Sequence, residues 1–500
     1  MTARNLADIV KDSASQRPAH IAVIDGDRKI TYAGLDDQIT ATATGLLTHG
    51  VTHGDRVALL LGNHIPFVVA LYAIVRAGAV AVPLNTSSTV TEIEHAVAQS
   101  GAKAIICDSE TSETVRAAQM GSCVRIMAGA SQWDSLQRQS DPDILPADTD
   151  PDSVAVLLFT SGSTGKPKAA ILTHRALLAN VEALLALSNP PALTADDRTL
   201  AVLPLFHVYS LNAVLSLTLA AGATVVLSER FSVSGTLELI EAHKVTVVAG
   251  APPMYVAWSA EQNLREALTS VRLLTSGAAP LPPALFDQIA TLTGQPIWEG
   301  YGLTECSPVV TTTLVSGRPK AGSVGGALGN LEVRVVPGGA APRDDDVTDD
   351  DETGEIWVRG PSLFSGYWPD YSHGPNDDGW FGTGDVGYFD DDHDLHLVDR
   401  RSDLILVSGF NVYPREVEDV ITMHDGVVEV AVTGVPHPYS GEAVKAFIVL
   451  SPGAQVDADE ILHFCRQRLA RYKCPTIVEV VPTLPHAVTG KLARGRLREE

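Results

Sequence analysis

A loop between two apolar segments has the composition to bind a polyphosphate. Residues 160–168 read Thr-Ser-Gly-Ser-Thr-Gly-Lys-Pro-Lys, and the apolar run 154–158 before them predicts a buried strand. Glycine lets the backbone approach an anion closely. Hydroxyl and N–H groups donate hydrogen bonds to oxyanions, and Lys166 and Lys168 add positive charge. These residue types in this spacing predict a cradle for linked phosphates.

The same loop differs from a Walker A phosphate loop. Lys166 is followed by Pro167, where that motif has Ser or Thr. Clusters of Ser, Thr and Gly also occur in flexible surface loops, so the loop alone leaves that alternative open. Its neighbours favour an ordered position. Residues 169–172 form a second short strand candidate, and Thr173 suits the N-cap of a helix that begins near His174.

The loop resembles the phosphate loop of the acyl-adenylate-forming superfamily, which includes acyl-CoA synthetases, the adenylation domains of peptide synthetases, and luciferases. Further stretches resemble other signatures of that superfamily in the expected order, over about residues 20–495. The resemblance implies that ATP is bound by the loop residues Thr160, Ser161, Gly162, Ser163, Thr164, Gly165, Lys166 and Lys168.

Two stretches resemble the adenine and metal signatures. In Gly-Tyr-Gly-Leu-Thr-Glu, residues 300–305, the resemblance implies that Tyr301 stacks on adenine, Thr304 contacts the α-phosphate and Glu305 binds Mg²⁺. A carboxylate is a suitable hard ligand for Mg²⁺. Alone, this stretch is also compatible with a strand-to-helix turn. Residues 276–280 resemble the adenine-lining segment, which implies nucleotide contacts from Gly277, Ala278 and Ala279.

Two later stretches resemble the ribose site and the domain hinge. In Trp-Phe-Gly-Thr-Gly-Asp, residues 380–385, the resemblance implies that Asp385 accepts hydrogen bonds from the ribose hydroxyls. An Asx turn is the alternative for this residue. In residues 399–403 it implies that Arg400 contacts ribose or phosphate. The hinge position that is commonly Asp or Lys in the superfamily is Ser402 here, so a charge is absent.

Two loops near the C-terminus resemble mobile elements of the superfamily. The resemblance implies that residues 408–413 approach coenzyme A, with contacts from Ser408, Gly409 and Phe410. It also implies that Lys491, which follows Thr489 and Gly490, is the catalytic lysine. A lysine in a terminal loop is usually a solvated charge. Its position relative to the other motifs favours the catalytic interpretation.

The resemblance implies a reaction in two halves. A carboxylate attacks the α-phosphate of MgATP to give acyl-AMP and pyrophosphate, and a thiol then attacks the mixed anhydride. We expect coenzyme A as the acceptor, because no carrier domain follows Lys491 in the sequence. A ligase that delivers its acyl-AMP to a separate carrier protein is an alternative. A catalytically silent nucleotide-binding scaffold is another, although Lys491, Glu305 and Asp385 are all present.

The predicted acid pocket is mostly apolar, which favours a fatty or aromatic acid over a dicarboxylate. We expect a medium- or long-chain fatty acid, with an aryl acid as the alternative. Its expected walls are residues 208–213, 250–254, 275–277 and 299–302. We expect His207 to orient the carboxylate or gate the pocket, unless it is a hydrogen-bonded core histidine. No acidic residue follows His207 in this stretch to hold an amino group. A dicarboxylate would need a second cation, for which Arg272 and Arg318 are distant candidates.

Apolar patterns place these motifs on a layered α/β fold. Strand and helix patterns alternate over residues 20–110 and 150–300, which predicts βαβ units. Residues 323–400 are rich in strands and loops, and a mixed α+β pattern follows. The predicted fold is a large layered N-terminal α/β domain with a β-rich subdomain and a small mobile α+β C-terminal domain. The predicted bounds are 1–399 for the large domain, 400–402 for the hinge and 403–500 for the small domain.

Composition restricts the partners. The formal net charge of −24 argues against binding of nucleic acid or an anionic membrane. The five cysteines form no Cys-x-x-Cys pair, which favours buried thiols in a reducing cytoplasm. Residues 201–228 lack Asp, Glu, Lys and Arg, a length that could span a bilayer, but polar residues interrupt them and predict a buried helix and strand instead. We expect a cytoplasmic protein whose partners are a small carboxylic acid, ATP and coenzyme A, without an integral membrane span; a homodimer is left open.

Overall fold

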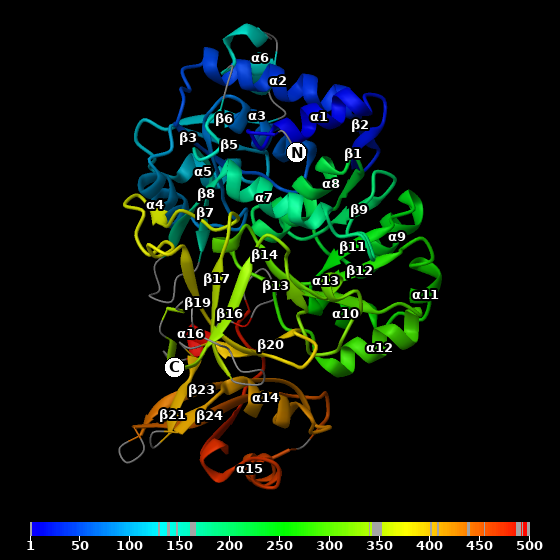
Figure 1. Ribbon diagram of the computed structural model, residues 1–500, viewed down its shortest axis with the longest axis vertical. Helices are drawn as coiled ribbons and strands as arrows, with labels where there is room; N and C mark the ends of the chain where they lie inside the picture. Colours follow the sequence, from blue (N-terminus) through cyan, green and yellow to red (C-terminus); the bar gives the residue numbers. More distant parts are fainter. Residues whose placement is uncertain are drawn as a thin grey trace. The chain divides into compact units, whose positions relative to one another are not determined.

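The structure is a computed structural model that divides into two compact units (Figure 1). It describes residues 3–128, 131–137, 141–146, 149–160, 167–339, 341–342, 353–400, 403–407, 410–437, 441–454, 456–486, 492 and 494–497. The first compact unit, called unit 1, comprises Met1–Gly162, Lys166–Val333 and Arg359–Phe381. The second, called unit 2, comprises Ser163–Gly165, Arg334–Val358 and Gly382–Glu500.

Unit 1 contains two large sheets. One has nine strands in the order β15-β14-β13-β12-β11-β9-β10-β1-β2. Its strands are β1 (Ile21–Asp25), β2 (Arg28–Thr31), β9 (Arg198–Ala201), β10 (Thr224–Leu227), β11 (Val247–Gly250), β12 (Leu273–Ser276), β13 (Ile297–Gly302), β14 (Val309–Thr312) and β15 (Gly326–Ala327). The other has seven strands in the order β18-β8-β7-β4-β3-β5-β6. Its strands are β3 (Arg56–Leu60), β4 (Val80–Pro83), β5 (Ala104–Cys107), β6 (Val124–Met127), β7 (Val154–Thr160), β8 (Lys168–Thr173) and β18 (Tyr367–Trp368).

Helices connect the parallel strands of unit 1. They are α1 (Asp8–Gln16), α2 (Tyr32–Thr48), α3 (Ile65–Arg76), α4 (Val90–Ser100), α5 (Ser112–Ala117), α6 (Ser131–Gln137), α7 (His174–Leu185), α8 (Leu217–Ala220), α9 (Val233–His243), α10 (Pro252–Trp258), α11 (Leu264–Ala267), α12 (Pro283–Thr293) and α13 (Thr313–Ser316). Short 3₁₀ turns lie at η1 (Pro142–Ile144) and η3 (Thr304–Cys306), and η2 (Tyr209–Ser216) is a π-helix.

The nine-stranded sheet is buried on both faces, as expected for parallel strands. Neighbouring residues of one strand enter different cores: Leu200 packs with α9, α10 and α12, whereas Ala201 packs with α1, α2 and α3. Side chains alternate across a strand, so this separation places one helical layer on each face. The predicted layered α/β fold is confirmed.

The uncharged segment 201–228 is a buried helical stretch followed by a strand, as predicted. Its helical part is the π-helix η2 and the short α8, and its strand is β10. Among the residues that the structure describes, no helix combines the length and apolar character that a membrane crossing requires.

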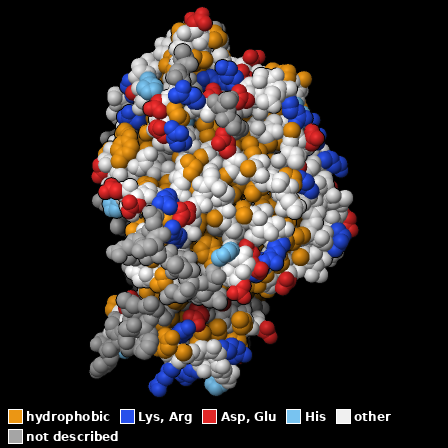
Figure 2. All heavy atoms as spheres, viewed as in Figure 1, with side chains coloured by type: hydrophobic (Ala, Val, Ile, Leu, Met, Phe, Trp, Pro, Cys, Tyr) orange, Lys and Arg blue, Asp and Glu red, His pale blue; other side chains and the backbone are white. Residues whose placement is uncertain are grey.

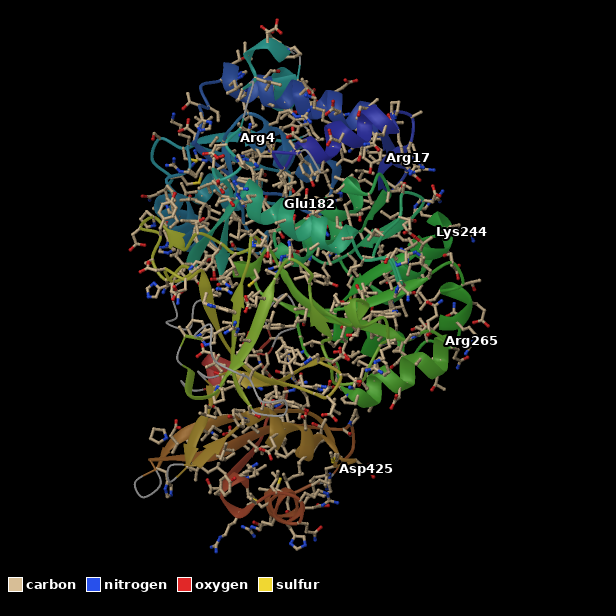
Figure 3. All side chains as sticks on the ribbon, viewed as in Figure 1. Arg4, Arg17, Glu182, Lys244, Arg265 and Asp425 are labelled. Atoms are coloured by element: carbon tan, nitrogen blue, oxygen red, sulfur yellow. The ribbon has the colours of Figure 1, made fainter. Side chains whose placement is uncertain are left out.

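Charged side chains at helix ends of unit 1 have structural partners. Figure 3 labels Arg17, which follows α1 and donates to the carbonyl of Gly222 at 3.1 Å. It also labels Arg265 of α11, which donates to the carbonyl of Thr291 in α12 at 3.0 Å. On the face drawn in Figure 2, the described basic side chains are interspersed with acidic ones, unlike the continuous basic patch that nucleic-acid binding uses.

Most of unit 2 is built on two further sheets. A four-stranded sheet has the order β16-β17-β19-β20, and the other has the order β22-β21-β24-β23 with β25 beside β24. The strands are β16 (Glu332–Val336), β17 (Gly354–Arg359), β19 (Trp380–Phe389), β20 (Leu395–Arg400), β21 (Ile405–Val407), β22 (Phe410–Val412), β23 (Val427–His437), β24 (Gly441–Leu450) and β25 (Ile477–Val480). Its helices are α14 (Pro414–Thr422), α15 (Ala458–Arg466), α16 (Arg494–Leu497) and the 3₁₀ turns η4 (Pro337–Gly339) and η6 (Arg471–Lys473).

The C-terminal helices α14 and α15 pack through their apolar faces. Pro414 opens α14, and Val417 and Ile421 of its apolar face are fully buried with Ile461 and Cys465 of α15. The division between units differs from the predicted bounds, because contacts group residues 382–400 with the C-terminal strands. The predicted hinge at 400–402 lies largely outside the described residues and stays a prediction.

Candidate active site

Three neighbouring parallel strands end at the same edge of the nine-stranded sheet. Gly250 of β11 is in register with Ser276 of β12, and Ser276 is in register with Glu299 of β13. In open α/β sheets ligands bind beyond the carboxyl ends of the strands. The predicted residues Gly277, Ala278 and Ala279 immediately follow β12. Tyr301 lies near the end of β13, and Thr304 and Glu305 follow that strand. The predicted adenine and metal motifs therefore lie at the edge where this fold binds ligands.

The turn after β12 has a constrained backbone. Ala278 has a φ of 68°, in the left-handed region that costs a non-glycine residue about 1 kcal/mol or more. The Gly277 N–H donates to the Gly250 carbonyl at 3.2 Å, and a Cβ at Gly277 would lie 3.3 Å from the Tyr209 ring. The Tyr209 hydroxyl is in turn 3.2 Å from the Thr275 hydroxyl. This segment, predicted to line adenine, is thus held between side chains of η2 and β12.

Glu305 lies on a tight turn after β13. The strand has an irregular register at Gly302, where a Cβ would lie 2.0 Å from the Pro308 carbonyl oxygen. Thr304 then starts the 3₁₀ turn η3, and Ser307 ends it with a φ of 68°. Glycine is required at 302 by this close approach, which turns the chain so that Glu305 is buried at 9% exposure.

One hydrogen-bond donor reaches the Glu305 carboxylate from the residues that the structure describes. The Tyr367 hydroxyl donates to its Oε1 at 2.6 Å. Burial and the negative charge of Glu305 raise the pKa of Tyr367 well above its ordinary value, so the phenol keeps its proton. Among the described residues, no Lys, Arg or His forms an ion pair with Glu305. A buried carboxylate is normally paired or bound to a metal, so its surroundings fit a divalent cation.

The donor set fits Mg²⁺ in particular. The described residues contain no group of three or more His, Cys, Asp or Glu that could hold a metal by itself. Mg²⁺ is usually bound by one or two carboxylates together with substrate phosphates and water. A single carboxylate, Glu305, linked through Tyr367 to Lys168 at the end of the predicted phosphate loop, matches that pattern; its role as a ligand stays a prediction.

The ends of the phosphate loop are held by a strand pair. Thr160 of β7 lies opposite Lys168 of β8 in an antiparallel ladder, and its hydroxyl is 3.4 Å from the Lys168 carbonyl oxygen. The Lys168 ammonium lies 5.3 Å from the ring centroid of Tyr367. The intervening predicted residues lie outside the described residues: Ser161, Gly162, Ser163, Thr164, Gly165 and Lys166.

His207 lies between β9 and the π-helix η2. Its Nε2 is buried and has no hydrogen-bond partner among the described residues, and its ring packs against Phe206 with centroids 4.5 Å apart. Burial lowers the pKa of His207 to about 4, so the ring is neutral at pH 7. A core histidine is expected to be hydrogen-bonded at each buried nitrogen. The orphaned Nε2 therefore favours the predicted role toward a ligand.

The predicted ribose residues are neighbours in unit 2. Asp385 of β19 pairs directly with Arg400 of β20 in an antiparallel register. Gly384 before it has a φ of 74°, and its N–H donates to Glu355 Oε1 at 3.2 Å, which sets the backbone that carries Asp385. Phe410 opens β22. Ser402, Ser408, Gly409 and Lys491 lie outside the described residues.

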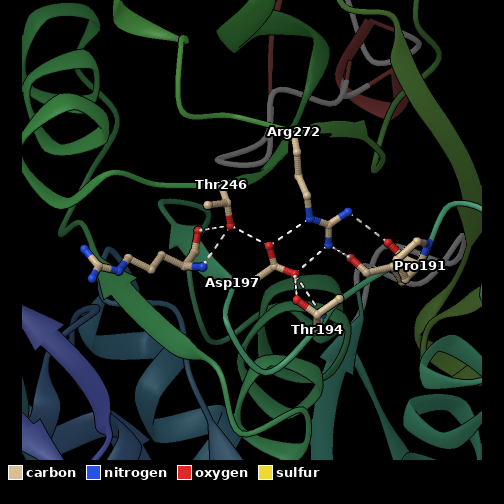
Figure 4. Close-up of polar contacts among 7 residues, drawn as sticks. Pro191, Thr194, Asp197, Thr246 and Arg272 are labelled. Atoms are coloured by element: carbon tan, nitrogen blue, oxygen red, sulfur yellow. Dashed lines mark hydrogen bonds and ion pairs between the residues drawn. The ribbon is translucent and has the colours of Figure 1, made fainter.

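Arg272 is not available as a second cation for a dicarboxylate. Its Nε donates to Asp197 Oδ1 at 2.8 Å, and a terminal nitrogen donates to Oδ2 at 2.6 Å (Figure 4). It also donates to the carbonyls of Pro191 and Ala192. These contacts hold the segment before β9, so the prediction of Arg272 as a candidate second cation for a dicarboxylate was wrong.

Sequence reasoning missed Tyr367. Tyr367 and Glu305 are 62 residues apart in the sequence. Their contact depends on the pairing of β18 with β8, which a local sequence pattern does not predict. The only available signal was an aromatic residue after Gly366 in a strand-rich region.

Comparison with known proteins gives consistent matches along the chain. A family model described as AMP-binding enzyme matches residues 10–368, and one described as AMP-binding enzyme C-terminal domain matches residues 416–491. A feruloyl-CoA synthase of Amycolatopsis sp is 40% identical, covering 97% of this chain and 96% of the relative. A long-chain-fatty-acid–CoA ligase of Bacillus subtilis is 32% identical, covering 99% of this chain and 94% of the relative.

Solved structures also match this chain over nearly its whole length. ATP-bound MatB from Rhodopseudomonas palustris matches with a TM-score of 0.91 at 32% identity, covering 99% of this chain and 98% of that one. The o-succinylbenzoate coenzyme A synthetase MenE from Bacillus subtilis, in complex with ATP and a magnesium ion, matches with a TM-score of 0.84 at 32% identity, covering 98% of each chain.

Proposed function

The chain belongs to the AMP-binding enzyme family as an AMP-forming acid–CoA ligase, and we propose that its acid is an aromatic acid of the ferulate class. The observation that carries the proposal is the 40% identity with a feruloyl-CoA synthase over 97% of the chain. A fatty acid, which the apolar pocket segments favour, is the second candidate, supported by the ligase of Bacillus subtilis at 32% identity.

Aromatic side chains near the predicted acid pocket support a planar substrate. Tyr209 is tied to Thr275 and lies against Gly277, and the Tyr255 hydroxyl donates to the Thr275 carbonyl at 2.7 Å. A Cβ at Gly250 would lie 2.9 Å from the Tyr255 hydroxyl oxygen, so glycine is needed there. Tyr255 is fully buried in the core, whereas Tyr209 is partly exposed and fixed against Gly277. A rigid ring at this position suits a flat aromatic substrate more than a flexible chain.

The proposed roles follow the chemistry of each group. Thr304 donates a hydrogen bond to the α-phosphate, and Lys168 adds positive charge beside the phosphates. Neutral His207 orients the acid carboxylate through Nε2, and Asp385 accepts from the ribose hydroxyls. Glu305 would hold Mg²⁺, which neutralises phosphate charge when bound.

The domain arrangement is part of the proposal. We propose that residues 403–500 rotate about a hinge at 400–402, so that Lys491 serves adenylate formation and the 408–413 loop serves thioester formation. Lys491→Ala is expected to slow adenylate formation about a hundredfold and to spare thioester formation from supplied acyl-AMP. Gly409→Leu is expected to show the reverse. Equal losses in both halves for Lys491→Ala would contradict the rotation.

A panel of acids tests the substrate. Ferulate, related aromatic acids and fatty acids of graded length are compared by pyrophosphate release and then by acyl-CoA formation. We expect kcat/KM for ferulate-like acids to exceed that for fatty acids by about tenfold or more, the scale of one well-formed pocket contact. A preference for fatty acids would select the second candidate. Pyrophosphate release without acyl-CoA would point to a carrier-protein acceptor.

A further inference from the structure

One tyrosine contacts both the predicted metal ligand and the end of the phosphate loop. The Tyr367 hydroxyl donates to Glu305 Oε1 at 2.6 Å, and its ring centroid lies 5.3 Å from the Lys168 ammonium. All three residues belong to unit 1. Tyr367 therefore links the predicted metal ligand to the end of the predicted phosphate loop.

The backbone around Tyr367 is fixed from two sides. Tyr367 pairs with Ala170 in the β18–β8 ladder, and the Ile171 N–H donates to the Gly366 carbonyl at 3.0 Å. Gly366 has a φ of 108°, and a Cβ there would lie 2.3 Å from the Tyr371 carbonyl oxygen. This strand pairing places the tyrosine beside β8, one of the two strands that flank the predicted phosphate loop.

The same segment also holds the backbone of Glu305. The Phe364 N–H donates to the Glu305 carbonyl at 2.8 Å, and the Phe364 ring meets the Tyr367 ring edge-on with centroids 5.1 Å apart. Residues 364–367 thus fix both the main chain and the carboxylate of Glu305. A hydroxyl that occupies one carboxylate oxygen orients the other oxygen.

We propose that Tyr367 is a positioning residue that orients the Glu305 carboxylate for a divalent cation and aligns Lys168 with the phosphates. The inference rests on the proposed role of Glu305. Hydrogen bonds to a ligating carboxylate fix its orientation, and their loss typically weakens metal binding about tenfold to a hundredfold. The face of the tyrosine ring attracts the Lys168 ammonium, which keeps this cation at the end of the predicted phosphate loop.

Tyr367→Phe tests the hydroxyl and leaves the ring in place. Binding of Mn²⁺ in the presence of a non-hydrolysable ATP analogue is measured by electron paramagnetic resonance, at a temperature well below each variant's unfolding midpoint. We expect about tenfold weaker metal binding, with a higher KM for Mg²⁺ in adenylate formation. Affinity for the analogue without metal is expected to change little. Tyr371→Phe is the matched control, because Tyr371 is 50% exposed and four residues away.

A double-mutant cycle with Glu305→Gln separates the two proposals. If Glu305→Gln leaves Mn²⁺ binding unchanged, the proposed metal role of Glu305 fails. If Glu305→Gln weakens binding and Tyr367→Phe does not, the positioning role alone is overturned. The hydroxyl is expected to lose its effect in the Glu305→Gln background. An equal effect in both backgrounds would mean that Tyr367 acts elsewhere and would also overturn the inference.

Discussion

Two buried carboxylates of unit 1 have opposite surroundings. Asp197 and Glu305 are 3% and 9% exposed. Asp197 accepts a bidentate pair from Arg272, a hydroxyl from Thr246 at 2.7 Å, and the N–H and hydroxyl of Thr194 (Figure 4). The carboxylate of Glu305 accepts one phenol, from Tyr367. The first carboxylate is surrounded by donors from the protein, and the second receives one donor from the described residues.

The contrast distinguishes Asp197, whose charge stabilises the fold, from Glu305, whose charge we propose binds a ligand. Burial alone would raise the pKa of Asp197, but the hydrogen bonds from Arg272 and Thr246 outweigh it and hold that pKa below its ordinary value. The ionised form is therefore the favoured one in the folded protein. At Glu305 no described cation offsets the desolvation of the charge. Folding around such a group costs free energy, which is regained when a cation binds.

The largest expected effect is on stability, from Arg272→Met. Removing one partner of a buried pair leaves an uncompensated charge. We expect a loss of about 3 kcal/mol in the free energy of unfolding, at the lower end for such pairs because the Arg272 side chain is 32% exposed. Urea denaturation measures it. Adenylate formation per folded molecule is expected to stay unchanged, and a drop in activity without loss of stability would place Arg272 in the active site.

Glu305→Gln is expected to have the opposite signature. Pyrophosphate release should fall about a hundredfold at limiting Mg²⁺, the scale of one lost electrostatic contact in a closed site. The free energy of unfolding should be equal or higher, because a buried charge without a described cationic partner becomes a neutral amide. Thermal unfolding without nucleotide checks this. A variant that is as unstable as Arg272→Met would mean that Glu305 is a structural residue like Asp197.

Two buried histidines show the same contrast in their hydrogen-bond partners, with a smaller expected effect. His174 and His207 both have a pKa lowered to about 4 by burial. His174 Nδ1 accepts the Leu6 N–H at 2.9 Å, whereas His207 Nε2 has no partner among the described residues. A bound carboxylate beside His207 would favour its protonated form and raise its pKa by about one unit, while that of His174 should stay constant. Histidine resonances followed by NMR with and without the acid test this; equal shifts at both rings would contradict it.

Local signals predicted the framework of the site. Thr173 caps α7 by accepting the Ala176 N–H at 3.1 Å, and the strands on both sides of the phosphate loop are as expected. Capping residues and apolar runs act over a few residues, so they can be recognised directly in the sequence. The distinction between Asp197 and Glu305 was not predictable, because each carboxylate is defined by partners far along the chain, such as Arg272, 75 residues from Asp197.

The smallest expected effect comes from Thr246→Val, which leaves Arg272 in place. The Thr246 hydroxyl donates to Asp197 at 2.7 Å and accepts the Arg198 N–H at 2.9 Å, so the variant loses two hydrogen bonds. Each contributes about 1 kcal/mol net, so the free energy of unfolding should fall by about 1–2 kcal/mol at pH 7. Thr291→Val is the control, because its exposed hydroxyl donates only to a carbonyl of its own helix. Metal and nucleotide binding should not change in either variant.

The pH dependence of that loss identifies its cause. Asp197 has a folded-state pKa below its ordinary value of 3.8, so its contribution to stability is present above that value and is lost as the pH falls through the folded-state pKa. With one donor fewer, the folded-state pKa of Asp197 moves back toward 3.8. The difference between Thr246→Val and the unmodified protein should therefore be largest at neutral pH. It should narrow below pH 3.8 to the part that comes from the Arg198 N–H, which does not titrate. A difference that stays constant down to that acid range would mean that the hydroxyl acts only through Arg198 and packing, and the contrast between the two carboxylates would then rest on Arg272 alone.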